Sequence, residues 1–274
     1  MLKIFYMDIS CGCSYEQSQA FYKILPKERQ ERIDRLHKEE MAQKRMLAGI
    51  FMQYGLSRMT GVSIGNICYS YGEQGKPELD WKNIRKTENM SVRKMEDVLM
   101  VHGGNVEQLD FSLSHSGKYA VLAVSDKLVG ADVERLRRNR LNVAKRCFHK
   151  REYEDIMALQ RKESCDRRFL EYWTMKEAYV KRTGDGLRIP LDSFCIKRGE
   201  DGVSSVEEAG GQRVWLATGY IEEDYAFSVC SKDWDDIQQL SDQKRYRDRD
   251  GKIFLPMEEI AVEQIYGFLN EKQD

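Results

Sequence analysis

Polar and apolar residues alternate along part of the chain in the two-residue period of a β-strand. Residues 118–124 predict a strand, 125–127 a turn, and 128–134 the returning strand. In the returning strand, Asp132 and Glu134 share one face, and Val129, Ala131 and Val133 share the other. The pattern therefore predicts a β-hairpin that ends with two carboxylates on the same side.

A second stretch has the period of a helix. From Phe169 to Lys181 the apolar residues form one stripe, with Lys176 inside it, Glu177 at its border and Lys181 one turn further. Burying an ammonium or a carboxylate costs on the order of several kcal/mol unless a partner compensates the charge. Either these residues meet opposite charges, or Lys176 snorkels to solvent and Glu177–Lys181 is an ordinary surface pair.

The remaining pattern suggests two similar α+β halves. A mixed-charge helical region at 27–58 contains a His-Lys phrase at 35–40, and a similar phrase at 147–152 opens the second helical region. Strands are predicted after the helices in each half, at 67–71 and 118–134 in the first half, and at 193–197, 213–218 and 226–230 in the second.

Length, charge and cysteine usage narrow the classes of protein. With 274 residues the chain can bury a real core, as one large domain or two smaller ones. A net charge of -1 argues against a whole-molecule nucleic-acid binder. The seven cysteines form no Cys-x-x-Cys pair, and no apolar run approaches the roughly 18 residues of a membrane span. With no signal-peptide pattern, we expect a soluble cytoplasmic protein with free thiols.

The paired carboxylates have a chemical interpretation. Asp132 and Glu134, two residues apart on a strand, offer oxygen ligands suited to a hard divalent cation. Glu177, from a facing helix, would supply a third carboxylate. The alternative is that acids at a strand end are simply solvated.

A series of short motifs, in a fixed order along the chain, narrows the choice to one family of proteins. Gly75-Lys76-Pro77 comes first, followed by Phe-Ser-Leu-Ser-His-Ser-Gly at 111–117 and Gly-Ala-Asp-Val-Glu at 130–134. Trp-Thr-Met-Lys-Glu-Ala-Tyr-Val-Lys at 173–181 and Gly-Asp-Gly-Leu at 184–187 complete it. In this order the motifs resemble the 4′-phosphopantetheinyl transferases, in particular their larger, surfactin-synthetase-activating type. Outside these motifs the match is loose.

The resemblance implies an α+β fold, a pseudo-dimer of two similar α/β halves with the active site at their junction. The expected halves are 1–127 and 128–274. Residues 81–110 separate two motifs more widely than the family does and are interpreted as a surface insertion. The tail at 235–274 is charged and then amphipathic, and its apolar residues are expected to cover core rather than to bind a partner.

The implied activity transfers the 4′-phosphopantetheine arm of coenzyme A to a serine of an apo carrier protein and releases 3′,5′-ADP. By resemblance, Asp132, Glu134 and Glu177 bind Mg²⁺. Glu177 also accepts the serine proton, directly or through a metal-bound water, and Lys181 stabilises charge on the phosphate.

The coenzyme A contacts implied by the resemblance come from eight residues. They are Arg45, Lys76, Pro77, Ser114, His115, Asp132, Lys176 and Lys181. Arg45 aligns with contacts to the 3′-phosphate, although a solvated helix arginine has the same appearance. Lys76 is equally compatible with an ordinary turn lysine. Lys176 would hold phosphate or orient Glu177.

The segment from Arg135 to Phe148 is strongly basic, with no acidic residue before Glu152. We expect it to dock an acidic apo carrier protein, of acyl, peptidyl or aryl type, on a monomeric enzyme with no nucleic-acid or membrane partner. A solvated face is the alternative, while a nucleic-acid role lacks stacking aromatics apart from Phe148. Two other functions remain open: another Mg²⁺-dependent phosphoryl transferase or hydrolase of a coenzyme A-like substrate, and a non-catalytic carrier-binding module.

Overall fold

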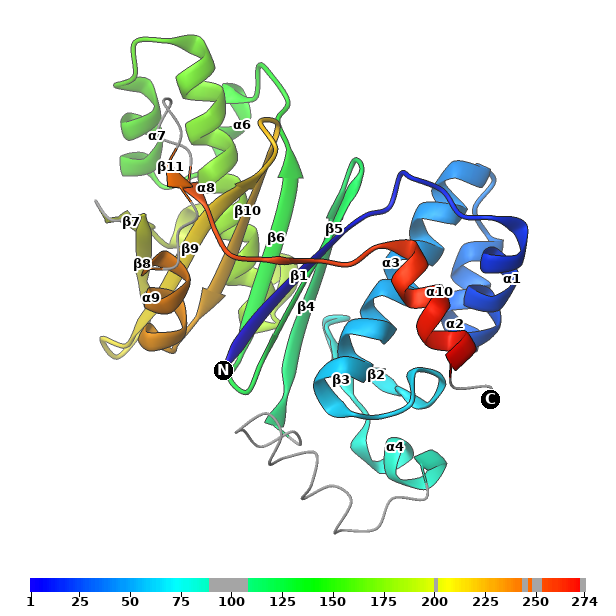
Figure 1. Cartoon of the computed structure of the whole chain (residues 1–274). Coiled ribbons are helices and arrows are strands. Elements are labelled where there is room, and N and C mark those ends of the chain that lie inside the picture. The colour runs from blue at the N-terminus through cyan, green and yellow to red at the C-terminus, as the bar shows by residue number, and fades with distance from the viewer. Residues whose placement is uncertain (89–107, 200–201, 243–245, 248–252, 272–274) are drawn as a thin grey trace.

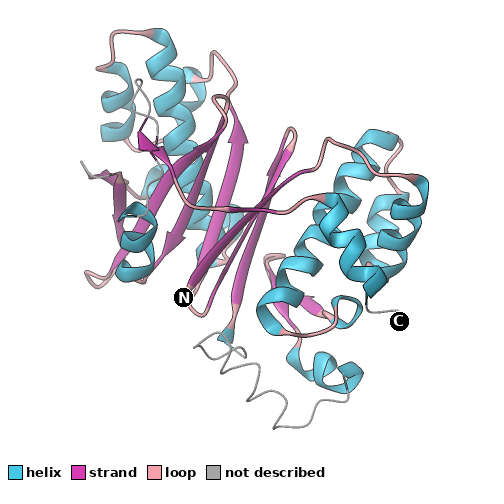
Figure 2. Cartoon of the chain, in the orientation of Figure 1, coloured by secondary structure: helices cyan, strands magenta, loops and turns pink. Residues whose placement is uncertain are grey.

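The computed structural model describes residues 1–88, 108–199, 202–242, 246–247 and 253–271. Two β-sheets lie side by side in the middle of the molecule, and helices pack on their outer sides (Figures 1 and 2). The three largest apolar cores of the described residues lie between the first sheet and its helices, between the two sheets, and between the second sheet and its helices. The predicted α+β class, with a sheet and helices in each half, is confirmed.

The first sheet packs on the long helix α3 (Glu39–Thr60). Its strands, in order across the sheet, are β13 (Glu258–Glu259), β1 (Leu2–Asp8), β5 (Tyr119–Ser125) and β4 (Asp110–Ser116). The smaller elements of this half are α1 (Tyr15–Ile24), α2 (Lys27–Asp34), η1 (Ile64–Asn66), β2 (Tyr69–Tyr71), β3 (Pro77–Leu79) and α4 (Trp81–Glu88). A side chain at Gly55 would collide with Leu122, so this glycine lets α3 lie directly on β5.

The second sheet packs on helix α8 (Lys162–Thr183), which has 22 residues, as α3 does. Its strands, in order, are β6 (Val129–Arg135), β10 (Tyr225–Ser231), β9 (Arg213–Ile221), β8 (Val203–Glu207) and β7 (Lys197–Arg198). The other elements are α6 (Leu141–Cys147), α7 (Lys150–Met157), η3 (Gly186–Arg188), η4 (Leu191–Ser193), α9 (Trp234–Asp242) and the two-stranded β11 (Tyr246–Arg247) and β12 (Ile253–Phe254). Each of the two long helices ends at a left-handed glycine, Gly61 in α3 and Gly184 in α8.

Gly130 determines how closely α8 approaches β6. A side chain here would overlap the carbonyl oxygen of Ala178 and the backbone nitrogen of Arg182. Because only a glycine permits this contact, the helix lies against the strand at the point where Asp132 follows. The residues of α8 around this contact are therefore brought to the same face of β6 as its carboxylates.

The two halves meet along β4 and β6, which belong to different sheets. Here side chains of β4, instead of its backbone, form the hydrogen bonds with the backbone of β6. The amides of Val129, Ala131 and Arg135 donate, respectively, to Asp110 Oδ2 at 2.8 Å, Ser112 Oγ at 2.9 Å and Ser116 Oγ at 3.2 Å. These partners advance together along both strands, so β4 and β6 run in the same direction. We call this contact the serine seam.

The end of the chain returns to the first half. Strand β13 pairs in parallel with β1, and helix α10 (Val262–Glu271) packs on α3 and α1, as Figure 1 shows. Ile260, Val262, Ile265 and Leu269 are buried in the first core. The expected division had placed the whole tail in the second half. The structure corrects this for residues 258–271, because their apolar side chains complete the core of the first half.

The expected insertion at 81–110 lies mostly outside the described residues, since 89–107 are not described. Both of its ends belong to the packed fold. Ile84 of α4 is fully buried, and Asp110 begins β4. In the described parts of the chain, no helix has the length and apolarity required to cross a bilayer.

Candidate active site

Asp132 is the centre of a cluster of charged residues at the junction. Its side chain is 4% exposed, and its Oδ1 accepts hydrogen bonds from Ser114 Oγ at 2.7 Å and Lys181 Nζ at 2.6 Å. Its Oδ2 is also buried but has no hydrogen-bond partner among the described residues. A buried carboxylate oxygen without a partner is unfavourable, so this atom fits a position that binds a cation.

Glu134 and Glu177 flank this aspartate, and the pKa of each carboxyl group is raised. Burial is the largest cause for both. The negative charge of Asp132 raises both values further, whereas the ammonium of Lys181 opposes the rise. Ser116 also opposes it at Glu134, through a hydrogen bond from its hydroxyl group. The three acids therefore repel one another in one partly desolvated region.

These acids fit a hard divalent cation by chemistry, because carboxylate oxygens are the ligands that Mg²⁺ prefers. A positive ion would satisfy Asp132 Oδ2 and offset the repulsion that raises the pKa of Glu134 and Glu177. Among the described residues, however, no three His, Cys, Asp or Glu side chains are arranged around a single point as a metal site requires. A shared ion at Asp132, Glu134 and Glu177 stays a prediction.

Lys181 is the counter-charge that the structure provides for the acids. It lies four residues after Glu177 on α8 but pairs with Asp132, so the alternative of a Glu177–Lys181 surface pair is wrong. Its ammonium also donates to Ser114 Oγ at 2.8 Å. Strand β4, strand β6 and helix α8 thus each supply one partner of this contact, and the junction of the halves holds all three.

His115 connects the acids to a positively charged region of the first half. Its side chain is exposed on β4, and the pKa of its imidazole is lowered. Desolvation by the surrounding protein is the largest cause, followed by the positive charges of Arg45, Lys181 and Arg29. Several positive charges around one imidazole form a favourable environment for phosphate groups. The expected residues Arg45 and His115 therefore lie in one region.

Arg29 was not identified from the sequence. It lies on α2, and its Nε donates to the hydroxyl group of Tyr69 at 2.5 Å. Its guanidinium also lies 5.5 Å from the centre of the Tyr69 ring. The mixed charge of α2 does not distinguish this arginine from its charged neighbours in the sequence. Only the tertiary fold brings it near His115.

Lys176 is not part of the cluster. It is fully buried, and its Nζ donates to the carbonyl groups of Leu191 at 2.7 Å and Phe194 at 3.0 Å. It also forms an ion pair with Glu152 at 2.9 Å, and that glutamate is 1% exposed. The expectation that Lys176 holds coenzyme A or orients Glu177 is wrong, as is the snorkelling alternative. The buried ammonium does need an anion, and Glu152 supplies it.

Lys76 is already bound within the protein. Its Nζ contacts Asp110 Oδ2 at 2.6 Å and the carbonyl oxygen of Val129 at 3.2 Å, so it joins one end of the serine seam. The side chains of Lys76 and Asp110 are 14% and 11% exposed. Pro77, next to it, begins β3. The expected contacts of Lys76 and Pro77 with the nucleotide stay predictions.

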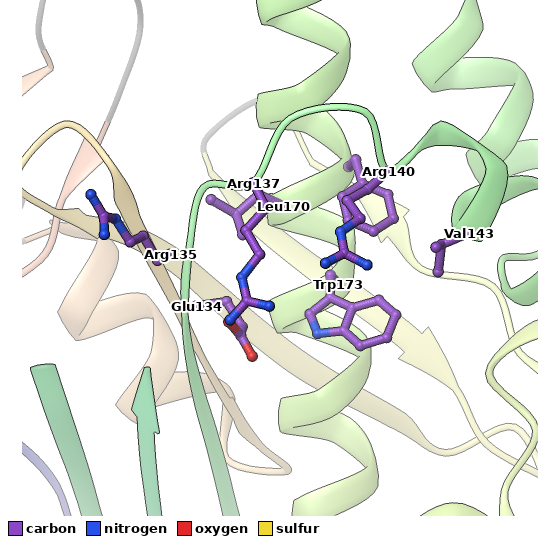
Figure 3. A pocket seen from close by; sticks show the side chains of 8 residues that line it. Glu134, Arg135, Arg137, Arg140, Val143, Leu170 and Trp173 are labelled. Carbon is purple, nitrogen blue, oxygen red and sulfur yellow. The ribbon is translucent and has the colours of Figure 1, made fainter. Parts of the chain in front are cut away.

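A cavity of about 140 Å³ adjoins the acids on the side of the basic segment. Its lining consists of Glu134, Arg135, Arg137, Arg140, Val143, Phe169, Leu170 and Trp173 (Figure 3). In Figure 3, Arg137 reaches toward Glu134, and its positive charge opposes the rise in the pKa of that carboxyl group, which burial causes. The basic segment therefore borders the acid cluster directly.

Comparison with known proteins gives matches in both halves. The family described as "4′-phosphopantetheinyl transferase, N-terminal" matches residues 12–127, and the "4′-phosphopantetheinyl transferase superfamily" matches residues 128–230. The second match contains Asp132, Glu134 and Glu177, and the first contains Ser114 and His115.

Curated relatives agree with these matches. The 4′-phosphopantetheinyl transferase Sfp of Bacillus subtilis (strain 168) is 27% identical over 231 residues, which are 84% of this chain and 92% of that protein. The 4′-phosphopantetheinyl transferase gsp of Aneurinibacillus migulanus is 26% identical and covers 75% of each chain. HetI of Nostoc sp., also named a 4′-phosphopantetheinyl transferase, is 36% identical over 130 residues, 46% of each chain. Because the family matches run across both halves and the junction that holds the acid cluster, the chain belongs to the 4′-phosphopantetheinyl transferase superfamily.

Proposed function

We propose that the chain transfers the 4′-phosphopantetheine arm of coenzyme A to a serine hydroxyl group of an apo carrier protein. The serine oxygen attacks the pantetheine-linked phosphorus, the pyrophosphate P–O bond breaks, and 3′,5′-ADP leaves. The observation that supports this is the cluster of Asp132, Glu134, Glu177 and Lys181 at the junction of two halves that both match the family. The site is assembled within one chain, which is consistent with a monomeric enzyme.

The region around His115 is suited to coenzyme A. This substrate carries a pyrophosphate and a 3′-phosphate. The positive charges of Arg29, Arg45 and Lys181 all lower the pKa of the His115 imidazole, which indicates that they lie near it. Arginine suits the fixed geometry of a phosphate group because its guanidinium donates two parallel hydrogen bonds. Arg45 is exposed and available to the 3′-phosphate, as the resemblance implies.

Asp132, Glu134 and Glu177 would hold Mg²⁺, which when bound neutralises the pyrophosphate and stabilises charge in phosphoryl transfer. Asp132 Oδ2 is the oxygen best prepared for this, since it is buried and unpaired among the described residues. Glu177 would accept the proton of the serine hydroxyl group, directly or through a metal-bound water, as the resemblance implies. Lys181, which pairs with Asp132, would stabilise negative charge on the reacting phosphate.

The basic segment at 135–148 would receive an acidic carrier protein. Arg137 and Arg140 line the cavity beside Glu134, together with Arg135. Arg135 also lies over the Tyr225 ring, 5.9 Å from its centre. Charge complementarity of this kind steers encounter and increases the association rate.

The test is incubation of the chain with coenzyme A, Mg²⁺ and a panel of apo acyl, peptidyl and aryl carrier proteins, followed by intact-mass measurement. We expect at least one carrier to gain the mass of phosphopantetheine, with stoichiometric release of 3′,5′-ADP. Free phosphopantetheine without a modified carrier would favour a hydrolase. Carrier binding without any mass gain would favour a non-catalytic module.

A further inference from the structure

Three serines alternate along β4 at positions 112, 114 and 116, and each is at least 94% buried. Residues two apart on a strand share a face, so all three face β6. Ser112 forms hydrogen bonds with the backbone of Ala131, whereas Ser114 and Ser116 each donate a hydrogen bond to a carboxylate of β6. The serine seam thus joins the two halves and also contacts the acid cluster.

The hydroxyl group of Ser116 has a defined orientation. Its oxygen accepts a hydrogen bond from the amide of Arg135 at 3.2 Å, and its hydrogen is donated to Glu134 Oε2 at 2.7 Å. A serine hydroxyl has one hydrogen to donate, so this arrangement directs it at the carboxylate. The hydrogen bond from Ser116 therefore holds one of the two carboxylate oxygens of Glu134.

We propose that Ser116 is a positioning residue for metal binding, acting through Glu134. This inference rests on the proposed function, because it assumes that Glu134 binds Mg²⁺. Glutamate has three side-chain torsions, and Glu134 is only partly buried, so packing alone leaves its carboxylate several orientations. A hydrogen bond from a fixed strand removes that freedom before the ion arrives. Loss of such an outer partner commonly weakens metal affinity about 10- to 100-fold.

Ser112 provides a matched control. It is 5% exposed, compared with 6% for Ser116, and its hydroxyl oxygen also accepts a hydrogen bond from a backbone amide of β6 across the seam. In the part of the chain that the structure describes, it forms no hydrogen bond with a carboxylate. Ser112→Ala therefore removes a seam hydrogen bond without disturbing Glu134, and any general loosening of the seam will appear in both variants.

The experiment titrates Mn²⁺ into the full chain in the presence of coenzyme A and follows free Mn²⁺ by electron paramagnetic resonance. Ser116→Ala is expected to raise the Mn²⁺ dissociation constant about 10- to 100-fold. Ser112→Ala is expected to leave it near the wild-type value, and Ser116→Thr, which retains the hydroxyl group, to restore most of the affinity. In transfer assays, Ser116→Ala should require more Mg²⁺ for half-maximal rate and recover much of kcat at saturating Mg²⁺.

The outcomes separate this inference from the proposed function. If wild type binds Mn²⁺ and Ser116→Ala binds it equally well, the positioning role is wrong and the metal site stands. Equal loss in Ser112→Ala and Ser116→Ala would also overturn it, since the effect would then come from the seam as a whole. If wild type with coenzyme A binds no Mn²⁺, the proposed metal site fails, and the role of Ser116 fails with it.

Discussion

Two lysines on α8 show how strongly function depends on the direction of a side chain. Lys176 and Lys181 are five residues apart and therefore point about 140° away from each other around the helix. Lys176 points into the third core, where Glu152 and two carbonyl groups bind it. Lys181 points to β6 and pairs with Asp132. The first is structural, and the second belongs to the acid cluster.

Replacing Lys176 with methionine should destabilise the protein without changing its binding of coenzyme A. The change leaves the carboxylate of Glu152 buried and unpaired, which costs about 3–5 kcal/mol. Urea unfolding measures the loss, and the KM for coenzyme A should stay unchanged for the folded fraction. The double variant Lys176→Met/Glu152→Gln should recover part of the stability, because the unpaired charge is gone. A raised coenzyme A KM with normal stability would contradict this assignment.

Replacing Glu177 with glutamine should have opposite effects on stability and activity. The raised pKa means that the folded state disfavours the ionised form, so this group contributes stability below its unfolded-state pKa and loses it as pH rises through its folded-state pKa. Near neutral pH, the neutral amide should therefore stabilise the metal-free protein, by roughly 0.5–2 kcal/mol. Transfer should fall by orders of magnitude because the base is lost.

The pH dependence of unfolding checks this interpretation. Measured in EDTA, the gain from Glu177→Gln should shrink as pH is lowered, since protonation neutralises the wild-type side chain as well. A variant less stable than wild type at every pH would show that the carboxylate is not under electrostatic strain.

At the scale of elements, the sequence predicted most of the strands and the helix that hold the residues of the candidate site. The strands predicted at 118–124 and 128–134, the helix around Trp173 and the strands near 213–218 and 226–230 appear as β5, β6, α8, β9 and β10. The predicted β-hairpin is wrong, because β5 pairs with β1 and β4 in the first sheet, whereas β6 pairs with β10 in the second. The strand expected at 193–197 is wrong for most of its length, because η4 occupies 191–193 and β7 begins only at Lys197. Strand β8 was missed, since its serine-rich sequence lacks clear alternation.

The serine seam could not be predicted from local pattern. Serines at alternate positions indicate one face of a strand, but not that the facing strand belongs to another sheet. The same limit applies to Lys76, whose partner Asp110 is separated from it by 34 residues. Contacts of this range depend on the tertiary fold, which short-range periodicity does not encode.

Charge reversal in the basic segment tests its role as a docking surface. Arg137→Glu with Arg140→Glu should raise the KM for the carrier protein and flatten its dependence on salt, while the KM for coenzyme A changes little. Arg146→Glu, at an exposed position that does not line the cavity, is the matched control and should have a smaller effect. An unchanged carrier KM in the double variant would remove the segment from the interface.

At the scale of the whole molecule, the chain forms two halves but does not divide cleanly between them. Leu255 lies in the core between the sheets, and Ile260 lies in the core of the first half, so the chain near its end spans both. The two family matches adjoin at residues 127 and 128, in the turn before β6. Residues near the end of the chain therefore pack into both cores beside the junction that holds the acid cluster.

Shortening a side chain of α10 tests this packing. Ile265 is fully buried in the first core, so Ile265→Ala should lower the free energy of unfolding by about 2–5 kcal/mol. Glu263→Ala, on the exposed side of the same helix, should change it little. Chemical denaturation compares the two. Equal stability of both variants would mean that the tail is not part of the first core.

The most direct test of the central claim is the intact mass of an apo carrier protein after incubation with coenzyme A and this chain. In EDTA the carrier should keep its mass, and added Mg²⁺ should restore the phosphopantetheine gain with wild type but not with Asp132→Ala. The circular dichroism of that variant should match wild type, because the residue lies at a polar junction and its loss relieves repulsion with Glu134 and Glu177. Full modification in EDTA, or by folded Asp132→Ala, would contradict a Mg²⁺-dependent transferase whose acids act at this junction.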